Sequence, residues 1–305
     1  MSSAARKLET QVDHYPSRIQ PTPKLLDRQE KVVYGKPADG PLGKQQLDSY
    51  AQKGYLTLNG IFTHEEMEQH LNELQRLRGD EQIRTSEAII REPGDDQIRS
   101  IFAIHQSDSI IARLCHDHRI VDIARQILGG DLYIHQSRVN YKPGFRGKEF
   151  YWHSDFETWH VEDGMPGMRT LSCSISLTPN TANNGPLMVI PGSHKKFLAC
   201  VGETPENHYK KSLRKQEFGV PDNANLSHMV DEGGIETPTG DAGMVTFFDC
   251  NIMHGSNSNI TPLARSNVFV VFNSVENTLV DPYCGLPPRP QFLANRVDYS
   301  PIQPI

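Results

Sequence analysis

The alternation of polar and apolar residues over 132–142 constrains the fold of this chain more than any other sequence feature. Successive side chains of a β-strand point to opposite faces. The polar side chains of the segment LYIHQSRVNYK fall on one face, at Gln136, Arg138, Asn140 and Lys142, and the other face carries Tyr133, Val139 and Tyr141. Four polar groups in register on one side of a strand require water or a ligand. The segment therefore predicts a strand whose polar face lines a binding site.

Helical patterns precede this strand. Thr63 followed by Glu66 forms a capping box before a run of apolar residues spaced three and four apart, which predicts a helix at about 63–78. Apolar residues recur at helical spacing over 107–128, and Gly129-Gly130 is a favourable helix end. We therefore expect short helices packed on a sheet.

The second half of the chain is dominated by strand patterns. Alternation over 169–177 separates Leu and Cys from a face of Ser172, Ser174 and Ser176, and further short strands are expected at 187–190, 243–248 and 265–273. Many short strands after a helical first third predict a mainly β fold with flanking helices and a double-stranded β-helix core, the jelly roll of the cupin-like proteins.

The domain organisation follows from length and composition. A chain of 305 residues with 37% hydrophobic content can bury one large core. Residues 1–45 are polar and rich in proline, which predicts an extended N-terminal arm, and residues 46–305 are expected to form a single domain. Residues 195–240 are charged and without clear periodicity, so we expect an insertion or a lid there.

Composition also excludes several classes of function. The net charge of -6 and the absence of a long basic run argue against nucleic-acid binding. No stretch approaches the roughly 20 apolar residues needed to span a bilayer, and the N-terminus lacks the apolar core of a signal peptide. Five cysteines lie far apart with no CxxC pair, which is typical of a reducing cytoplasm. We therefore expect a cytoplasmic protein that does not bind a membrane.

Three residues form a candidate metal site. His153 and Asp155 are two residues apart, and His254 follows on another expected strand. On an extended segment His153 and Asp155 would point the same way. Two imidazoles and one carboxylate on one face of an octahedral ion suit non-haem Fe(II) in oxygenases. Taken alone, an HxD pair is more often a surface histidine near an aspartate with no metal.

An arginine after the third ligand indicates a co-substrate. Arg265 comes eleven residues after His254 and opens the next expected strand, on the face that also carries Asn267 and Phe269. A guanidinium pairs with a carboxylate through two parallel hydrogen bonds. Arg265 could therefore anchor the far carboxylate of 2-oxoglutarate while the 2-oxo-acid end binds the iron.

Longer motifs around these residues carry a family resemblance. The segment FYWHSDFETWHVEDGMP over 150–166, with QSRVNYK upstream and NNGPLMVIPGSH downstream, resembles the ectoine hydroxylases, a group within the phytanoyl-CoA dioxygenase-like family. The resemblance covers roughly residues 130–275. It implies a homodimeric oxygenase that uses Fe(II), O₂ and 2-oxoglutarate to convert the compatible solute ectoine to 5-hydroxyectoine, with release of succinate and CO₂, and thereby serves protection against osmotic stress.

The same resemblance assigns residues to each part of the site. The implied iron ligands are His153, Asp155 and His254. The implied contacts to 2-oxoglutarate are Lys142 and Arg265, supported by Asn140, Phe150, Ser172 and Ser256. The implied contacts to ectoine are Gln136, Trp159, Phe248, Asn267 and Phe269, together with Arg138. Ectoine is a zwitterion with a cyclic amidinium and a carboxylate, so aromatic faces and hydrogen-bond donors are the groups expected around it.

Other interpretations remain open at this stage. Trp159, Phe248 and Phe269 could be ordinary core residues, and Arg138 could form a structural ion pair with Glu149 or Glu157. His135 and His160 are expected to be structural rather than ligating. Two other functions also remain, a related hydroxylase of another small amino acid or acyl substrate, and a metal-binding cupin-like protein without catalysis.

Overall fold

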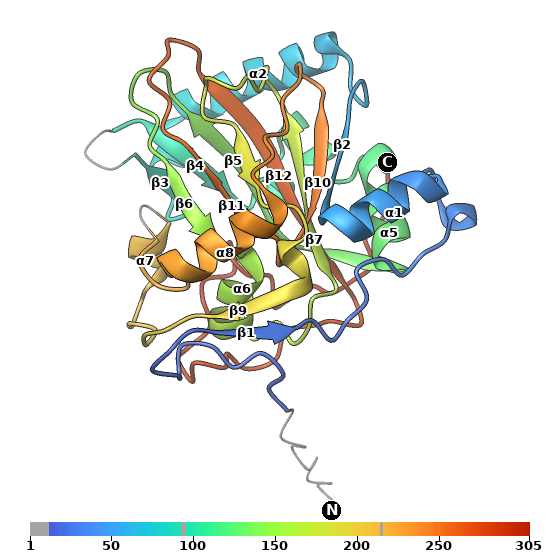
Figure 1. Ribbon diagram of the computed structural model, residues 1–305. Coiled ribbons are helices and arrows are strands. Elements are labelled where there is room, and N and C mark those ends of the chain that lie inside the picture. The colour runs from blue at the N-terminus through green and yellow to red at the C-terminus, as the bar shows by residue number, and fades with distance from the viewer. Residues whose placement is uncertain (1–11, 93–95, 214–215) are drawn as a thin grey trace, which may run out of the picture.

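The computed structural model describes residues 12–92, 96–213 and 216–305, and Figure 1 shows its two main sheets, which face each other. The larger sheet has seven antiparallel strands, in the order β2 (Tyr55–Leu58), β10 (Val245–Asp249), β7 (Thr170–Ser176), β12 (Arg265–Ser274), β5 (Leu132–Lys142), β4 (Ile98–Phe102) and β3 (Ile89–Arg91). The smaller sheet contains β6 (Phe150–His153), β11 (His254–Ser256) and β8 (Leu187–Val189). The prediction of a mainly β, jelly-roll core is confirmed.

Helices cover the outer face of the larger sheet. They are α1 (Lys44–Lys53), α2 (His64–Gly79), α3 (Glu81–Arg84), α4 (Ile110–Leu114) and α5 (His118–Leu128), and short 3₁₀ turns lie at Pro37–Asp39, Ile104–Gln106 and Ser193–Lys195. Apolar side chains of α1, α2, α4 and α5 share one buried cluster with the outer-facing residues of the sheet. Thr63 caps α2 by accepting a hydrogen bond from the Glu66 backbone N–H, as its sequence predicts. Gly129 ends α5 with a φ of 67°.

The alternation predicted for 169–177 is present in β7. Leu171, Cys173 and Ile175 belong to the cluster beneath the helices. Ser172 and Ser174 are also buried, and they pair in register with Phe248 and Thr246 of β10. The hydroxyl groups therefore lie on the inner face, toward the smaller sheet.

A β-bulge in β5 corrects one predicted face. Val271 of β12 pairs with Gln136, but the next residue, Phe272, pairs with Ile134, so His135 is left out of register. A bulge of this kind exchanges the two faces of a strand beyond it. Ile134 therefore joins Val139 in the helix-side cluster, and the prediction that Tyr133 shares the face of Val139 was wrong. Instead, Tyr133 accepts a hydrogen bond on its hydroxyl from Asn273, at 2.8 Å.

The N-terminal region and the 195–240 segment contain elements that the sequence patterns did not indicate. β1 (Lys24–Asp27) pairs with β9 (Lys196–Ala199), and 195–240 also includes α7 (Tyr209–Ser212) and α8 (Asn223–Gly233). The apolar face of α8 is limited to Leu226, Met229 and Val230, which pack on a small cluster with Ile190 and Met253. Three residues give too short a periodic pattern to stand out in a charged segment. Within the described residues, none of the helices combines the length and the apolar character that crossing a membrane requires.

Candidate metal centre and active site

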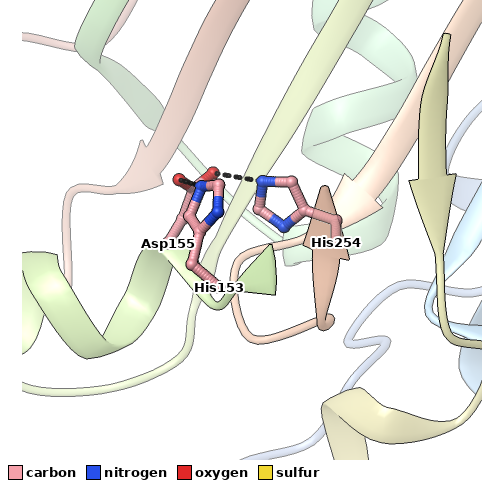
Figure 2. A group of neighbouring side chains, drawn as sticks. All are labelled: His153, Asp155 and His254. Atoms are coloured by element: carbon pink, nitrogen blue, oxygen red, sulfur yellow. Dashed lines mark ion pairs between the residues drawn. The ribbon is translucent and has the colours of Figure 1, made fainter. Parts of the chain in front are cut away.

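Strand pairing brings the three candidate metal ligands together. His153 is the last residue of β6 and His254 the first of β11, and the two are direct partners in the smaller sheet. Asp155 Oδ1 lies 3.7 Å from His153 Nε2, and Asp155 Oδ2 lies 3.8 Å from His254 Nε2. In Figure 2 both imidazole rings lie beside the carboxylate. All three residues can place a ligand atom within 4.8 Å of the others, and they are the one such group of histidine, cysteine and acidic residues in the part of the chain that the structure describes.

The carboxylate of the candidate triad, Asp155, does not lie on a strand as its spacing predicted. Asp155 is the first residue of helix α6 (Asp155–Asp163), and Ser154 is the extended residue before it. An anionic side chain is favoured at this position because the helix dipole leaves partial positive charge at its N-terminus. A strand followed by a helix start therefore brings His153 and Asp155 to one ion, where an uninterrupted strand was expected.

Backbone carbonyls orient both imidazoles. Nδ1 of His153 lies 2.6 Å from the carbonyl oxygen of Tyr151, and Nδ1 of His254 lies 3.0 Å from that of Ile252. If each Nδ1 carries the proton and donates it, each Nε2 keeps a lone pair for the metal. Ser172, which was assigned to 2-oxoglutarate, lies 3.4 Å from Asp155 Oδ2 and donates to it.

The protonation states of the triad also fit a divalent cation. Burial raises the pKa of Asp155, but His254 and His153 lower it by more, so its pKa falls below its usual value. Burial and the neighbouring His153 lower the pKa of His254 to about 4. At neutral pH the site therefore offers a carboxylate and a neutral imidazole, the forms that bind a metal ion. This donor set fits Fe(II).

A second cluster of charge lies where β5 and β12 pair. Lys142 and Arg265 are direct partners, and both are buried. The Lys142 amine donates to Ser256 Oγ at 2.8 Å and to the carbonyl oxygen of Asn257 at 2.5 Å. Burial, then the charges of Arg265 and Arg99, lower the pKa of Lys142 to about 6. Two basic groups buried this close together favour an anion between them, because an anion would restore the charged form of the amine.

Arg265 and its neighbours complete this anion-binding region. Burial and the charge of Arg99 lower the pKa of Arg265 to about 10, and among the described residues no hydrogen-bond partner reaches its Nε. The Arg99 guanidinium lies 3.7 Å from the centre of the Phe150 ring. Asn140 accepts a hydrogen bond from Ser100 at 2.8 Å. The structure thus places Lys142, Arg265, Asn140, Phe150 and Ser256 at one end of the site.

An inner cavity of about 90 Å³ lies beside the triad. It is lined by seven of the residues that the sequence singled out, namely Gln136, Arg138, Asn140, Phe150, His153, Asp155 and Trp159. It is also lined by seven that sequence reasoning missed, namely Ser100, Phe102, Thr158, Ser212, Leu213, Gln216 and Arg289. A larger cavity of about 650 Å³ adjoins it and shares Phe150, His153, Ser212 and Gln216 in its wall.

Three residues assigned to ectoine lie outside the lining of that inner cavity. The Phe248 ring packs 5.2 Å from the ring of His254 and 6.4 Å from that of Phe269. Asn267 donates to Ser174 Oγ at 2.9 Å, and its own Oδ1 is buried without a partner among the described residues. Phe248 and Asn267 therefore contact His254 and Ser174, and Phe269 contacts the cavity residue Arg138.

Arg138 binds Gln136 and not Glu149 or Glu157, the two partners that the sequence suggested. It donates to Gln136 Oε1, and its guanidinium lies 4.8 Å from the centre of the Phe269 ring. Glu157, which was a candidate for its ion pair, instead binds Arg18. Gln136 in turn donates to the carbonyl oxygen of Leu293 at 2.7 Å, so this polar wall is fixed by the C-terminal segment.

His160 and His135, which were expected to be structural, contact other protein groups and not the candidate metal site. His160 lies 2.8 Å from the carbonyl oxygen of Met165 and 2.9 Å from Asp13 Oδ1. His135, at the bulge, packs its ring 5.3 Å from that of Trp159. Neither residue belongs to the metal-ligand group, as expected.

Arg289 is the most informative residue that sequence reasoning missed. It is deeply buried, and it binds Asp163 through two hydrogen bonds of 2.7 and 2.6 Å. Because it also lines the inner cavity, it adds a second guanidinium to the wall that holds Arg138. Arg289 stands alone among prolines in the sequence LPPRP, so no helix or strand pattern pointed to it. The one charge in this apolar run could nevertheless have marked it as a candidate site residue.

Comparison with known proteins identifies the family. The phytanoyl-CoA dioxygenase (PhyH) family model matches residues 50–267. The chain belongs to the phytanoyl-CoA dioxygenase family. Within the family it groups with the ectoine dioxygenases, and it is 54% identical to the ectoine dioxygenase of Bordetella bronchiseptica over 96% of each chain.

Solved structures agree with this assignment. The crystal structure of EctD from S. alaskensis with 2-oxoglutarate and 5-hydroxyectoine superposes with a TM-score of 0.88 and 45% identity, over 96% of this chain and 98% of that one. The structure of the same protein with bound Fe gives a TM-score of 0.87 and 44% identity over the same shares. The similarity thus extends well beyond the 130–275 region that the sequence motifs covered.

Proposed function

We propose that this family member hydroxylates ectoine to 5-hydroxyectoine, using Fe(II), O₂ and 2-oxoglutarate and releasing succinate and CO₂. The observation that carries the proposal is the position of the metal triad. His153 and Asp155 form part of the wall of a cavity that also holds Gln136, Trp159 and Arg289. A substrate in that cavity lies next to the metal.

His153, Asp155 and His254 would hold the iron, with the two Nε2 atoms and one carboxylate oxygen as ligands. When bound, Fe(II) supplies the activation of O₂ that hydroxylation of an unreactive carbon needs. The carboxylate stays charged without a metal, and the backbone carbonyls of Tyr151 and Ile252 fix the ring orientations. The triad is therefore preorganised, so binding requires little rearrangement.

Lys142 and Arg265 would hold 2-oxoglutarate by its far carboxylate. Arg265 retains a buried N–H without a partner among the described residues, and the Lys142 amine has used two hydrogens on Ser256 and Asn257. A carboxylate would satisfy the guanidinium and would favour a third proton on the amine. Phe150, which lines the inner cavity beneath Arg99, and Asn140 would support the chain of the co-substrate.

Ectoine would occupy the inner cavity. Its carboxylate suits the guanidinium groups of Arg138 and Arg289, together with the Gln136 amide, and its amidinium suits the face of Trp159. Phe248, Asn267 and Phe269 would act behind this wall, through His254, Ser174 and Arg138. These residues hold the target carbon in place, and placement matters because an error of about 1 Å can cost roughly a hundredfold in rate.

We further propose a homodimer, a cytoplasmic location and a role in protection against osmotic stress. Four of the five cysteines are buried and all five are free in the structure, which suits a reducing compartment. Sedimentation of the purified chain at several concentrations tests the dimer. A monomer at all of them would overturn that part of the proposal.

The central test measures succinate and hydroxylated product together. The protein is reconstituted anaerobically with Fe(II) and 2-oxoglutarate, and O₂ is then admitted with ectoine, with another small amino acid, or with neither. Stimulation of succinate release by ectoine, with an equal amount of 5-hydroxyectoine by mass spectrometry, is the expected result. Stimulation only by another substrate would indicate a related hydroxylase. Release of no succinate under any condition would leave the non-catalytic, metal-binding interpretation.

A further inference from the structure

Arg18 lies outside the reaction site but is built into its support. It belongs to the N-terminal arm, which runs below α6 and beside β9 in Figure 1. Its φ is 59°, in the left-handed region that a side chain with a Cβ rarely adopts, and only 3% of the residue is exposed. A strained backbone that buries a charged side chain persists only where its contacts fix it.

The Arg18 guanidinium uses all its nitrogens on the surrounding protein. Nε and Nη2 donate to the two carboxylate oxygens of Glu157 at 3.0 and 2.6 Å. Nη1 donates to Glu162 Oε1 at 2.7 Å and to Thr204 Oγ1 at 3.0 Å. Nη2 also lies 3.5 Å from the hydroxyl of Thr158, to which it donates. This pairing is two-pronged and fully buried, the geometry in which an arginine fixes position best.

Both carboxylates belong to the helix that carries the site. Helix α6 is nine residues long and begins at the metal ligand Asp155. Thr158 and Trp159, which line the inner cavity, lie between Glu157 and Glu162 on the same helix. By holding Glu157 and Glu162, Arg18 therefore fixes the helix on both sides of the cavity residues.

The same group of contacts reaches the segment that covers the cavity, here residues 200–213. Thr204 accepts from Arg18, and His208 Nδ1 lies 2.7 Å from Glu162 Oε1. Ser212 and Leu213, at the end of this cover segment, line the inner cavity. Gly219, further along the chain, approaches so closely that an added Cβ would lie 2.2 Å from Glu157 Oε2 and 2.5 Å from Arg18 Nη2.

We propose that Arg18 is a positioning residue for the hydroxylation, which locks helix α6 and the cover segment together around the substrate cavity. The inference rests on the proposed function and deepens it, because Arg18 touches no substrate. Its loss removes the guanidinium from both carboxylates and leaves Glu157 with the Ser17 hydroxyl and Glu162 with His208. A buried carboxylate that has lost its cation moves toward water or takes up a proton. Either response shifts Thr158 and Trp159 relative to the metal ligand on the same helix.

The test compares two arginine variants of the same arm. Arg18→Met removes the guanidinium that joins helix α6 to the cover segment. Arg28→Met is the matched control, because Arg28 also forms a buried ion pair, at 2.7 Å with Asp249 on β10, but contacts neither Glu157 nor Glu162 in the hydrogen bonds and ion pairs of the described residues. Three quantities are measured for each variant, kcat/KM for ectoine, the ratio of 5-hydroxyectoine to succinate, and the rate of tryptic cleavage after Lys210 and Lys211.

Arg18→Met is expected to lower kcat/KM for ectoine by about tenfold or more, to lower the product ratio, and to accelerate cleavage of the cover segment. Arg28→Met is expected to lose thermal stability without these changes. Arg18→Lys keeps the charge but not the two-pronged pairing, so it should recover stability more than the product ratio. Equal ratios and equal cleavage rates in Arg18→Met and Arg28→Met would overturn the proposal.

A milder variant keeps the test decisive if Arg18→Met does not fold. Thr204→Val removes only the bond from Arg18 to the cover segment. It is expected to lower the product ratio, and an unchanged ratio would overturn the proposal. Should the unmodified protein form no 5-hydroxyectoine, the proposed function fails, whereas the cleavage rates still decide whether Arg18 holds the cover segment.

Discussion

Binding of 2-oxoglutarate is expected to place a proton on Lys142. The pKa of this buried amine is about 6 because burial and the charges of Arg265 and Arg99 oppose the ammonium form. A bound carboxylate removes that opposition, since an anion favours the charged form of a neighbouring amine. Above pH 6 the protein therefore takes up a proton as the co-substrate binds, and affinity falls as the pH rises.

The magnitude follows from the pKa. With a pKa of about 6, the amine is protonated in roughly 24% of molecules at about pH 6.5 and in roughly 1% at about pH 8, so the dissociation constant should rise about twentyfold between them. Near pH 7 the uptake should be about 0.9 proton per molecule bound. Lys142→Met should abolish the uptake and weaken binding at about pH 6 by ten- to a hundredfold, the loss of one charge-assisted hydrogen bond.

Calorimetry measures this uptake directly. Anaerobic protein loaded with Fe(II) is titrated with 2-oxoglutarate in two buffers of different ionisation enthalpy, and the difference in heat gives the protons taken up. Lys142→Met in the same buffers subtracts protons exchanged by other groups. Uptake near zero in the unmodified protein, or equal uptake in both proteins, would refute the assignment of Lys142 to the co-substrate.

Three further predictions test other parts of the site and fold. His254→Ala should abolish Fe(II) binding measured anaerobically and lower turnover more than about a hundredfold, since even the loss of an outer partner of a ligand costs ten to a hundredfold; a normal iron content would contradict the ligand set. Arg265→Lys should raise KM for 2-oxoglutarate about tenfold, because the two-pronged pairing is lost, and leave KM for ectoine unchanged; an effect on ectoine alone would count against it. Phe272→Ala, in the core beneath the helices, should lower the free energy of unfolding in urea by about 3–5 kcal/mol; a loss below about 1 kcal/mol would mean that the core closes around the gap.

Regular patterns allowed much of the fold to be predicted. The alternation in β7 and β12 gave the two faces of the larger sheet, and the capping box at Thr63 gave the start of α2. The faces of β5 were predicted correctly only after residue 135, because a bulge produces no change in composition that a period of two would reveal. Helix α8 was missed because its apolar face is only three residues long, at Leu226, Met229 and Val230.

Some residues of the candidate site could likewise be predicted from the sequence, and others could not. The candidate metal ligands were recognised because His153 and Asp155 lie two residues apart and imidazoles and carboxylates are the residue types that bind iron, and the motif around them indicated the family. Arg289 and Arg18 were missed because each acts through partners more than a hundred residues away. A partner so far along the chain leaves no trace in the sequence around the arginine itself.

The sequence by itself indicated the chemistry of this protein, namely a candidate set of metal ligands, the basic residues suited to a dicarboxylate, and the β-rich core that carries them. Only the tertiary structure decided how these groups meet. Pairing in register sets His153 against His254 and Lys142 against Arg265, and the start of a helix turns Asp155 toward the two histidines. The physical reason is that ligand type and strand period are properties of neighbouring residues, whereas register and burial depend on how distant segments pack.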